Sequence, residues 1–148
     1  MRMLLVLTAA IAATPALARD SVSIDSAVFI ETAAVSGGRD ARTLAQVDNL
    51  RRGDRVVLLV NWHSNDRKGF TITSEVPAHL AFRESASQIQ DVSVDGGRNW
   101  GLLGQLTIRD RYDDRIAGPA DVTHLRWRVS AREAVGRRGS IAYSATVR

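Results

Sequence analysis

The chain has 148 residues, no cysteine, 45% hydrophobic residues and a formal net charge of +4. Without cysteine, disulfides, thiolate metal sites and a lipid-modified cysteine are excluded, and the length favours one domain with a core that needs no disulfide. Because basic and acidic residues alternate along the chain rather than forming a basic run, we expect no nucleic-acid partner.

Residues 1–18 have the layout of a secretory signal peptide. Arg2 supplies the positive charge, Met3–Ala13 form an apolar segment, and Ala16–Ala18 offers a small-x-small cleavage site. The apolar segment is shorter than the roughly 20 residues that a bilayer core requires. We therefore expect a signal peptide over residues 1–18, a single domain over residues 19–148 with no membrane span, and residence in the periplasm, in the medium or at the cell surface.

The first half of the mature chain is dominated by strand signals. We expect an N-terminal strand within Val22–Val35 and a helix candidate at Asp40–Asn49. Arg55–His63 is apolar on both of its faces, which predicts a central strand covered on both sides. Shorter strands are expected where apolar residues stand two positions apart, at Phe70 and Ile72, Leu80 and Phe82, Val92 and Val94, and Leu106 and Ile108.

The second half continues in the same way. Pro119–Val122 is expected to form one helical turn before a strand at Thr123–Val129, and Ile141–Arg148 is the last strand. Both strands alternate apolar with polar residues, the pattern of one face on a core and one in water. With glycine-rich turns between the strands, the sequence predicts an all-β fold, an antiparallel sandwich of about seven to nine strands.

Several of these segments carry a family resemblance. They are the Gly53–Val56 turn with the strand that ends at Asn61, Ile72–Pro77, Leu80–Phe82, Val92–Trp100, and Leu125–Trp127 through Gly139–Ile141. Together they resemble an Ig-like bacterial conserved-repeat domain, the domain of unknown function number eleven of exported and cell-surface proteins. The family usually has Leu-Pro at the corner where this chain has Val76-Pro77, and Pro-Gly where this chain has Val135–Gly139. The resemblance implies an Ig-like sandwich, here in a single copy instead of the usual tandem repeats.

One short motif fits the Asp-box pattern Ser-x-Asp-x-Gly-x-x-Trp of sialidase-like propellers, with Ser93, Asp95, Gly97 and Trp100 at its fixed positions. Asp95 can accept hydrogen bonds from turn amides, and Gly97 permits left-handed backbone geometry. One copy without blade periodicity does not make a propeller. We therefore interpret these four residues as a structural hairpin.

Metal ligands are the next candidates. His63, His79 and His124 could hold zinc together with Asp66 or Asp121. Because these histidines are not spaced as a ligand pair on one element, we expect them to be ordinary surface residues.

Four aspartates near one polar loop suggest calcium: Asp110, Asp113, Asp114 and Asp121. Calcium takes about six to eight oxygen ligands. The interleaved Arg109, Arg111 and Arg115 instead neutralise these carboxylates, so we expect no metal and no cofactor.

Enzyme chemistry finds little support in the sequence. There is no cysteine nucleophile and no G-x-S-x-G elbow, and paired carboxylates for glycoside hydrolysis would need a cleft. We therefore expect no catalysis. Among the tryptophans, Trp62 and Trp127 fall on core faces, which leaves Trp100 as the candidate contact for a ligand.

These observations lead to a functional expectation. The chain is expected to be an exported, non-catalytic structural or protein-interaction module that binds another envelope or surface protein through edge strands or end loops. The candidate surfaces are the loops His63–Lys68 and Arg109–Ala117. Two alternatives stay open: a carbohydrate-binding accessory protein of the cell envelope that uses Trp100, and a small metal-dependent hydrolase built around His63 or His124.

Overall fold

The computed structural model describes residues 22–36, 39–46, 49–65, 67–89, 91–135 and 138–148, with side chains described except at residues 32–46. The expected signal peptide, residues 1–18, lies outside the described residues. No helix within these ranges is both long and apolar enough to cross a bilayer.

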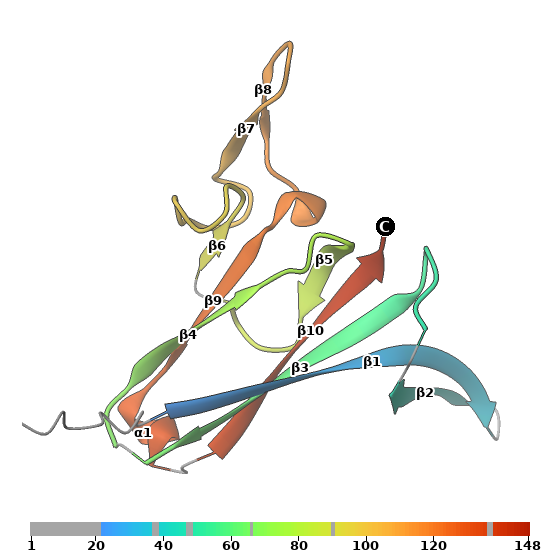
Figure 1. The fold of residues 1–148 in the computed structure, drawn as a ribbon, viewed down its shortest axis with the longest axis vertical. Coiled ribbons are helices and arrows are strands. Elements are labelled where there is room, and N and C mark those ends of the chain that lie inside the picture. Colours follow the sequence, from blue (N-terminus) through green and yellow to red (C-terminus); the bar gives the residue numbers. More distant parts are fainter. Residues whose placement is uncertain (1–21, 37–38, 47–48, 66, 90, 136–137) are drawn as a thin grey trace, which may run out of the picture.

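The larger of two packed sheets has five antiparallel strands in the order β2-β1-β3-β10-β5 (Figure 1). These strands are β1 (Val22–Ser36), β2 (Arg39–Gln46), β3 (Arg55–Ser64), β5 (Leu80–Ser85) and β10 (Arg138–Val147). The central position expected for the Arg55–His63 strand is confirmed, because β3 pairs with β1 on one side and with β10 on the other.

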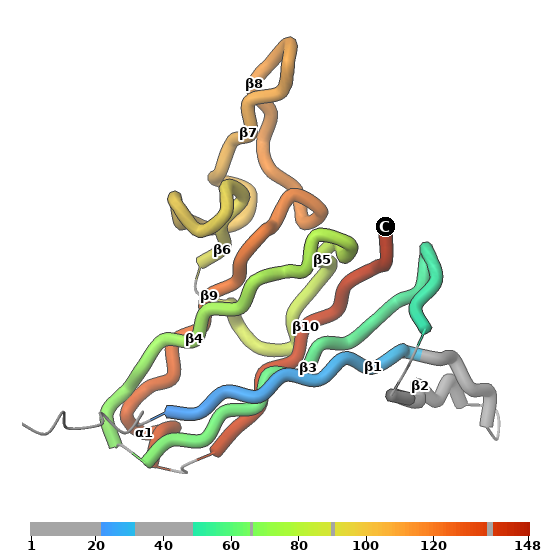
Figure 2. The backbone as a smooth tube through the Cα atoms, viewed as in Figure 1, coloured from blue at the N-terminus to red at the C-terminus, as the bar shows by residue number. Residues whose placement is uncertain are grey.

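The smaller sheet has three antiparallel strands in the order β4-β9-β6. They are β4 (Phe70–Glu75), β9 (His124–Val129) and β6 (Asp91–Ser93). Two further strands, β7 (Thr107–Arg109) and β8 (Asp114–Ile116), pair only with each other. Their hairpin projects beyond both sheets at the top of the view (Figure 2). The expected antiparallel all-β sandwich is thus confirmed, and the eight strands of its two sheets fall within the expected number.

The core lies between the inward faces of the two sheets. Along β3, the even-numbered side chains from Val56 to Trp62 are buried, and so are alternate residues of β9 and β10. Trp62 and Phe70 meet edge to face with ring centroids 5.2 Å apart, and Trp127 lies 5.9 Å from Tyr143. Trp62 and Trp127 are therefore core residues, as the alternation predicts.

Two expectations about strands and helices are wrong. Residues 40–46 of the expected helix Asp40–Asn49 belong to strand β2, which pairs with β1 from Ser36 opposite Arg39 to Phe29 opposite Gln46. Pairing along a long neighbouring strand here overrides a local helical pattern. On β3, the second face is not fully covered, because Val57 and Leu59 are only half-buried.

The short helical turns are partly as expected. The turn predicted at Pro119–Val122 is present as the 3₁₀ helix η1 (Pro119–Asp121). A second turn, α1 (Ala131–Ala134), follows β9 and was not expected. Its signal is the pair Ser130 and Glu133: the Glu133 carboxylate accepts from the Ser130 backbone N–H at 2.7 Å, and the Glu133 backbone N–H donates to Ser130 Oγ at 3.3 Å. This is a capping box, and its Ser-x-x-Glu pattern is recognisable in the sequence.

Candidate functional site

The loop after β6 is organised by Ser93. This side chain is fully buried at the end of β6, and its Oγ donates to Asp95 Oδ1 at 2.8 Å while accepting from the Gly97 backbone N–H at 2.9 Å. Gly96 and Gly97 both have positive φ, at 78° and 84°, which side-chain-bearing residues rarely adopt. The buried hydroxyl therefore fixes a tight turn that depends on glycine.

Asp95 closes the same loop from the other end. Its carboxylate accepts from the backbone N–H groups of Arg98 and Asn99, at 3.1 and 2.9 Å, and from Asn99 Nδ2 at 2.6 Å. These hydrogen bonds, with the Asn99 backbone N–H first, lower the pKa of Asp95 from 3.8 to about 2. The carboxylate is thus occupied by its own loop and is not presented to a ligand.

Trp100 is held against the loop and the small sheet. Its indole N–H donates to the Gly97 carbonyl at 2.9 Å, and the Arg126 guanidinium lies 4.2 Å from the ring centroid. Arg126 is itself paired with Asp91 at 2.8 Å, and His124 meets the indole edge to face at 6.2 Å. Trp100 is half-buried rather than exposed, and a cation already lies over its ring.

The structure brings the four Asp-box positions together as one hairpin. Ser93 contacts Asp95 and Gly97, and Trp100 contacts Gly97. Just beyond Trp100, Gly101 exchanges backbone hydrogen bonds with Val92 at 3.0 and 2.8 Å, which closes the hairpin. The arrangement supports the interpretation of these residues as structural.

The histidines lie apart from one another. His63 is exposed at the end of β3, His79 is exposed near the Pro77 corner, and His124 contacts Trp100. The described part of the chain holds no group of three or more His, Asp or Glu side chains placed to bind a metal ion. Asp66, one of the residues considered for zinc, lies outside the described residues.

The polar loop Arg109–Ala117 proves to be the β7–β8 hairpin. At its base, the two terminal nitrogens of Arg115 donate to the two carboxylate oxygens of Asp121, each at 2.7 Å. Asp121 also accepts from the Gly118 backbone N–H at 2.8 Å. The Arg115 guanidinium is the main cause that lowers the pKa of Asp121 from 3.8 to about 2. This bidentate pair ties the hairpin to η1.

The other aspartates of the hairpin are also engaged. Asp114 accepts from Arg109 Nε at 3.1 Å, and Asp110 and Asp113 each accept from the backbone N–H of the next residue. Their oxygens are therefore directed to separate partners instead of converging as calcium ligands would.

Pairing within the hairpin defines its free face. Ile108 stands opposite Arg115, so these two side chains share the face that is tied to η1, while Thr107 and Ile116 share the other face. Ile116 is 65% exposed, and Tyr112 at the tip is 95% exposed. An aromatic ring and an aliphatic side chain thus stand in solvent on a braced projection. The period-two pattern marked Ile108 but gave no sign that Ile116 and Tyr112 would remain exposed.

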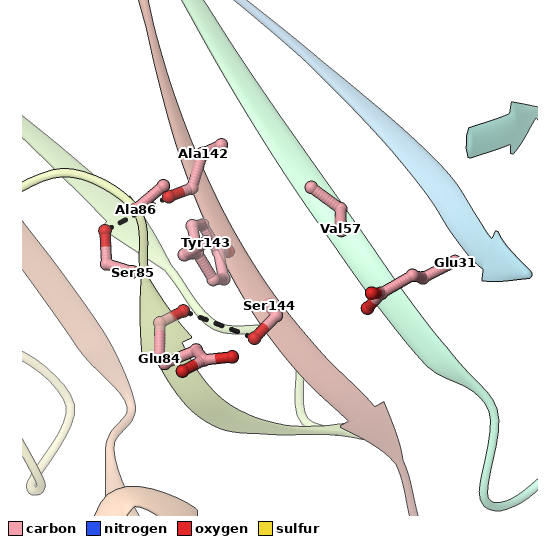
Figure 3. A pocket seen from close by; sticks show the side chains of 8 residues that line it. All are labelled: Glu31, Val57, Glu84, Ser85, Ala86, Ala142, Tyr143 and Ser144. Atoms are coloured by element: carbon pink, nitrogen blue, oxygen red, sulfur yellow. Dashed lines mark hydrogen bonds between the residues drawn. The ribbon is translucent and has the colours of Figure 1, made fainter. Parts of the chain in front are cut away.

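A shallow hollow of about 420 Å³ lies on the outward face of the large sheet (Figure 3). Glu31 from β1 and Glu84 from β5 reach it from opposite sides, with Val57 and Ser144 between them (Figure 3). A carboxylate oxygen of Glu31, Oε2, also lies 3.9 Å from Nε of Arg55. Strand parity does not single out these two glutamates. Glu31 falls on the outward side of β1, but Glu84 has the parity of the buried Leu80 and Phe82 and lies opposite Ser144 only because the β5–β10 register shifts there.

The other candidate surface, His63–Lys68, is a connection between β3 and β4. His63, Asn65, Arg67 and Lys68 are exposed, whereas Ser64 is fully buried. This loop offers polar and charged side chains without an exposed aromatic or aliphatic group among its described residues. It is therefore a weaker candidate for protein binding than the hairpin.

No protein-family model, curated protein or solved structure matches this chain.

Proposed function

We propose that this chain is an exported, non-catalytic module that binds another envelope or surface protein through the β7–β8 hairpin. The Ig-like character that the sequence resemblance implies, and residence in the periplasm or at the cell surface, are parts of the same proposal. The layout of residues 1–18 supports export.

The observation that carries the proposal is the exposure of Tyr112, at 95%, on a hairpin that the Arg115–Asp121 pair holds in place. Tyrosine is enriched among the residues that dominate protein-binding energy. Its ring can be buried by a partner with little loss of conformational entropy, since only two side-chain torsions must be fixed. A braced support lowers the ordering cost further.

The carbohydrate alternative gains less support from the geometry. A sugar-stacking platform needs an open aromatic face, but Arg126 lies over the ring of Trp100 and the indole N–H is already bonded to Gly97. The hydrolase alternative needs ligands around His63 or His124, and these two histidines belong to different surroundings. The hairpin is the better site on both counts.

The test is site-specific photo-crosslinking in the intact cell envelope. A benzoyl-phenylalanine in place of Tyr112 should form one dominant adduct with another protein, because it keeps an aromatic ring at the tip of the hairpin. The same probe in place of Arg52, an exposed residue in the turn before β3, is the control and should give no such adduct. Equal adducts at both positions, or none at Tyr112 in the exported protein, would contradict the proposal.

A further inference from the structure

One stretch of β1 has a free edge. β1 pairs with β3 over Val22–Ile30, but with β2 only from Phe29 onward. Among the described strands, residues 22–28 therefore have a hydrogen-bonding neighbour on one side only. An edge of this length can accept another extended strand.

Two other edges of the sandwich, β5 and β4, are protected. On β5, Arg148 donates from Nε to the Leu80 carbonyl and from a terminal nitrogen to the Ala120 carbonyl of η1, each at 2.9 Å. On β4, Thr71, Thr73 and Glu75 are exposed polar side chains. Polar, charged or covered edges are the usual defence against strand addition.

The free stretch of β1 instead carries aliphatic side chains on its core side. In the β1–β3 register, Ile24 stands opposite Trp62 and Val28 opposite Leu58, so they share the face of these buried residues. Yet Ile24 is 52% and Val28 is 38% exposed. The small sheet does not cover them, which leaves apolar area beside an open edge.

We propose that a second copy of this chain pairs with this edge, antiparallel and two-fold symmetric, with Ser26 opposite Ser26. This register places Ile24 of each copy opposite Val28 of the other on the core side. On the outward side it places Asp25 opposite Ala27. Aliphatic cross-strand pairs stabilise a sheet, and like charges directly opposite each other destabilise it. This register therefore has the stabilising aliphatic pairs and sets no like charges directly opposite each other.

The neighbouring symmetric register is less favourable. Centring the pair on Asp25 would set the two Asp25 carboxylates directly opposite each other and would place Ile24 against Ser26. Centring it on Ala27 would require Phe29 and Ile30, which already pair with β2. Centring it on Ile24 would oppose the two Ile24 side chains, but it would set Val28 opposite residue 20, outside the described residues. The register centred on Ser26 is therefore the one that pairs both aliphatic residues within the described free edge, and such a self-complementary contact closes as a dimer.

The absence of cysteine makes the register directly measurable. Opposite Cα atoms in an antiparallel pair are about 4.5–5.5 Å apart, which is within reach of a disulfide. Ser26→Cys should therefore give a disulfide-linked dimer under mild oxidation. At micromolar protein it should form at least about tenfold faster than random collision allows, because paired thiols meet at an effective concentration on the order of millimolar.

Ser23→Cys is the matched control, since Ser23 is also exposed and lies on the same strand. In the proposed register the two residues 23 are separated by six positions, roughly 20 Å along the strand, so cross-linking should be slow. A mixture of the Ile24→Cys and Val28→Cys chains should give the mixed disulfide in preference to either like pair. Equal rates for Ser26→Cys and Ser23→Cys would overturn the proposal, as would a purified unsubstituted chain that sediments as a monomer at all concentrations.

Discussion

The guanidinium of Arg115 and the carboxylate of Asp121 form a two-pronged ion pair, with both N–O distances at 2.7 Å. The pair joins a strand of the projecting hairpin to η1, which leads directly into β9. Because β9 carries the fully buried Leu125 and the buried Trp127, the hairpin is anchored close to the core. This relationship explains how a solvent-exposed projection can hold a defined orientation.

The first prediction concerns this anchor. Asp121→Asn should loosen the hairpin while leaving the sandwich folded, because an amide cannot accept both N–H groups of Arg115. We expect faster hydrogen exchange at Ile108 and Arg115, which face each other as a hydrogen-bonded pair of the hairpin. We also expect a loss of about 1 kcal/mol or less of global stability, the range of partly exposed ion pairs. Asp113→Asn removes a charge but keeps an oxygen that can accept from the Asp114 backbone N–H, so it should change neither. Unchanged exchange in Asp121→Asn would show that the pair does not brace the hairpin.

Acid should weaken the fold over a defined interval. Hydrogen bonds from Asn99 and from Arg115, respectively, lower the pKa values of Asp95 and Asp121 from 3.8 to about 2. A depressed native pKa stabilises the fold above the unfolded value, and that contribution is lost as pH falls from about 4 towards 2. The free energy of unfolding, measured with urea at pH 2, 3 and 5, should show this decline, and it should fall less steeply with pH for Asp121→Asn. The same pH dependence of the unfolding free energy in the variant and in the unsubstituted chain would contradict the linkage.

The fit of β10 against Trp62 gives a packing prediction. Gly139 stands opposite Trp62, and a Cβ at this position would come within 2.5–2.8 Å of the indole atoms. Trp62 is buried and lies edge to face with Phe70, so it has little room to move. Gly139→Ala should therefore destabilise by about 1–3 kcal/mol. Ser140→Ala, at the exposed neighbouring position, should be close to neutral in the same denaturation experiment.

The Asp-box loop should prove structural. Asp95→Ala removes the acceptor for the backbone N–H groups of Arg98 and Asn99, so both amides should exchange faster and the melting temperature should fall. Asp110→Ala, which loses one local hydrogen bond, serves as the control for removing an exposed carboxylate. If Asp95→Ala abolished partner binding while melting normally, the loop would be a binding site and the structural interpretation would fail.

Local patterning predicted most of the sandwich. The alternation of Leu125, Trp127 and Val129 with polar residues identified β9, and the run of apolar residues on both faces from Val56 onward identified β3. Both were predictable because the spacing of apolar residues along a strand shows whether one or two of its faces are buried. The helix expected at Asp40–Asn49 was wrong, because residues 40–46 form a hairpin with the long strand β1 that directly precedes them. The turn α1 was not predicted, although the spacing of Ser130 and Glu133 is that of a capping box.

The candidate surfaces depended on information that local patterns lack. The sequence marked Arg109–Ala117 as a polar loop, but the exposure of Tyr112 and Ile116 depends on how far the hairpin projects from the sheets. Likewise, Ile24 and Val28 show the parity of core residues, and only the three-stranded width of the small sheet leaves them uncovered. Local sequence gives the face of a residue and does not give what lies above that face.

The most direct test of the proposed function is affinity capture from the cell-envelope fraction, where the proposal places this chain. The capture compares the unsubstituted chain with Tyr112→Ser and with Arg52→Ser. We predict that one stoichiometric partner is retained by the unsubstituted chain and by Arg52→Ser, and that Tyr112→Ser loses at least about tenfold of that affinity, the scale of a binding hot spot. Retention of the same partner by all three chains at equal affinity would contradict the assignment of the β7–β8 hairpin as the binding surface.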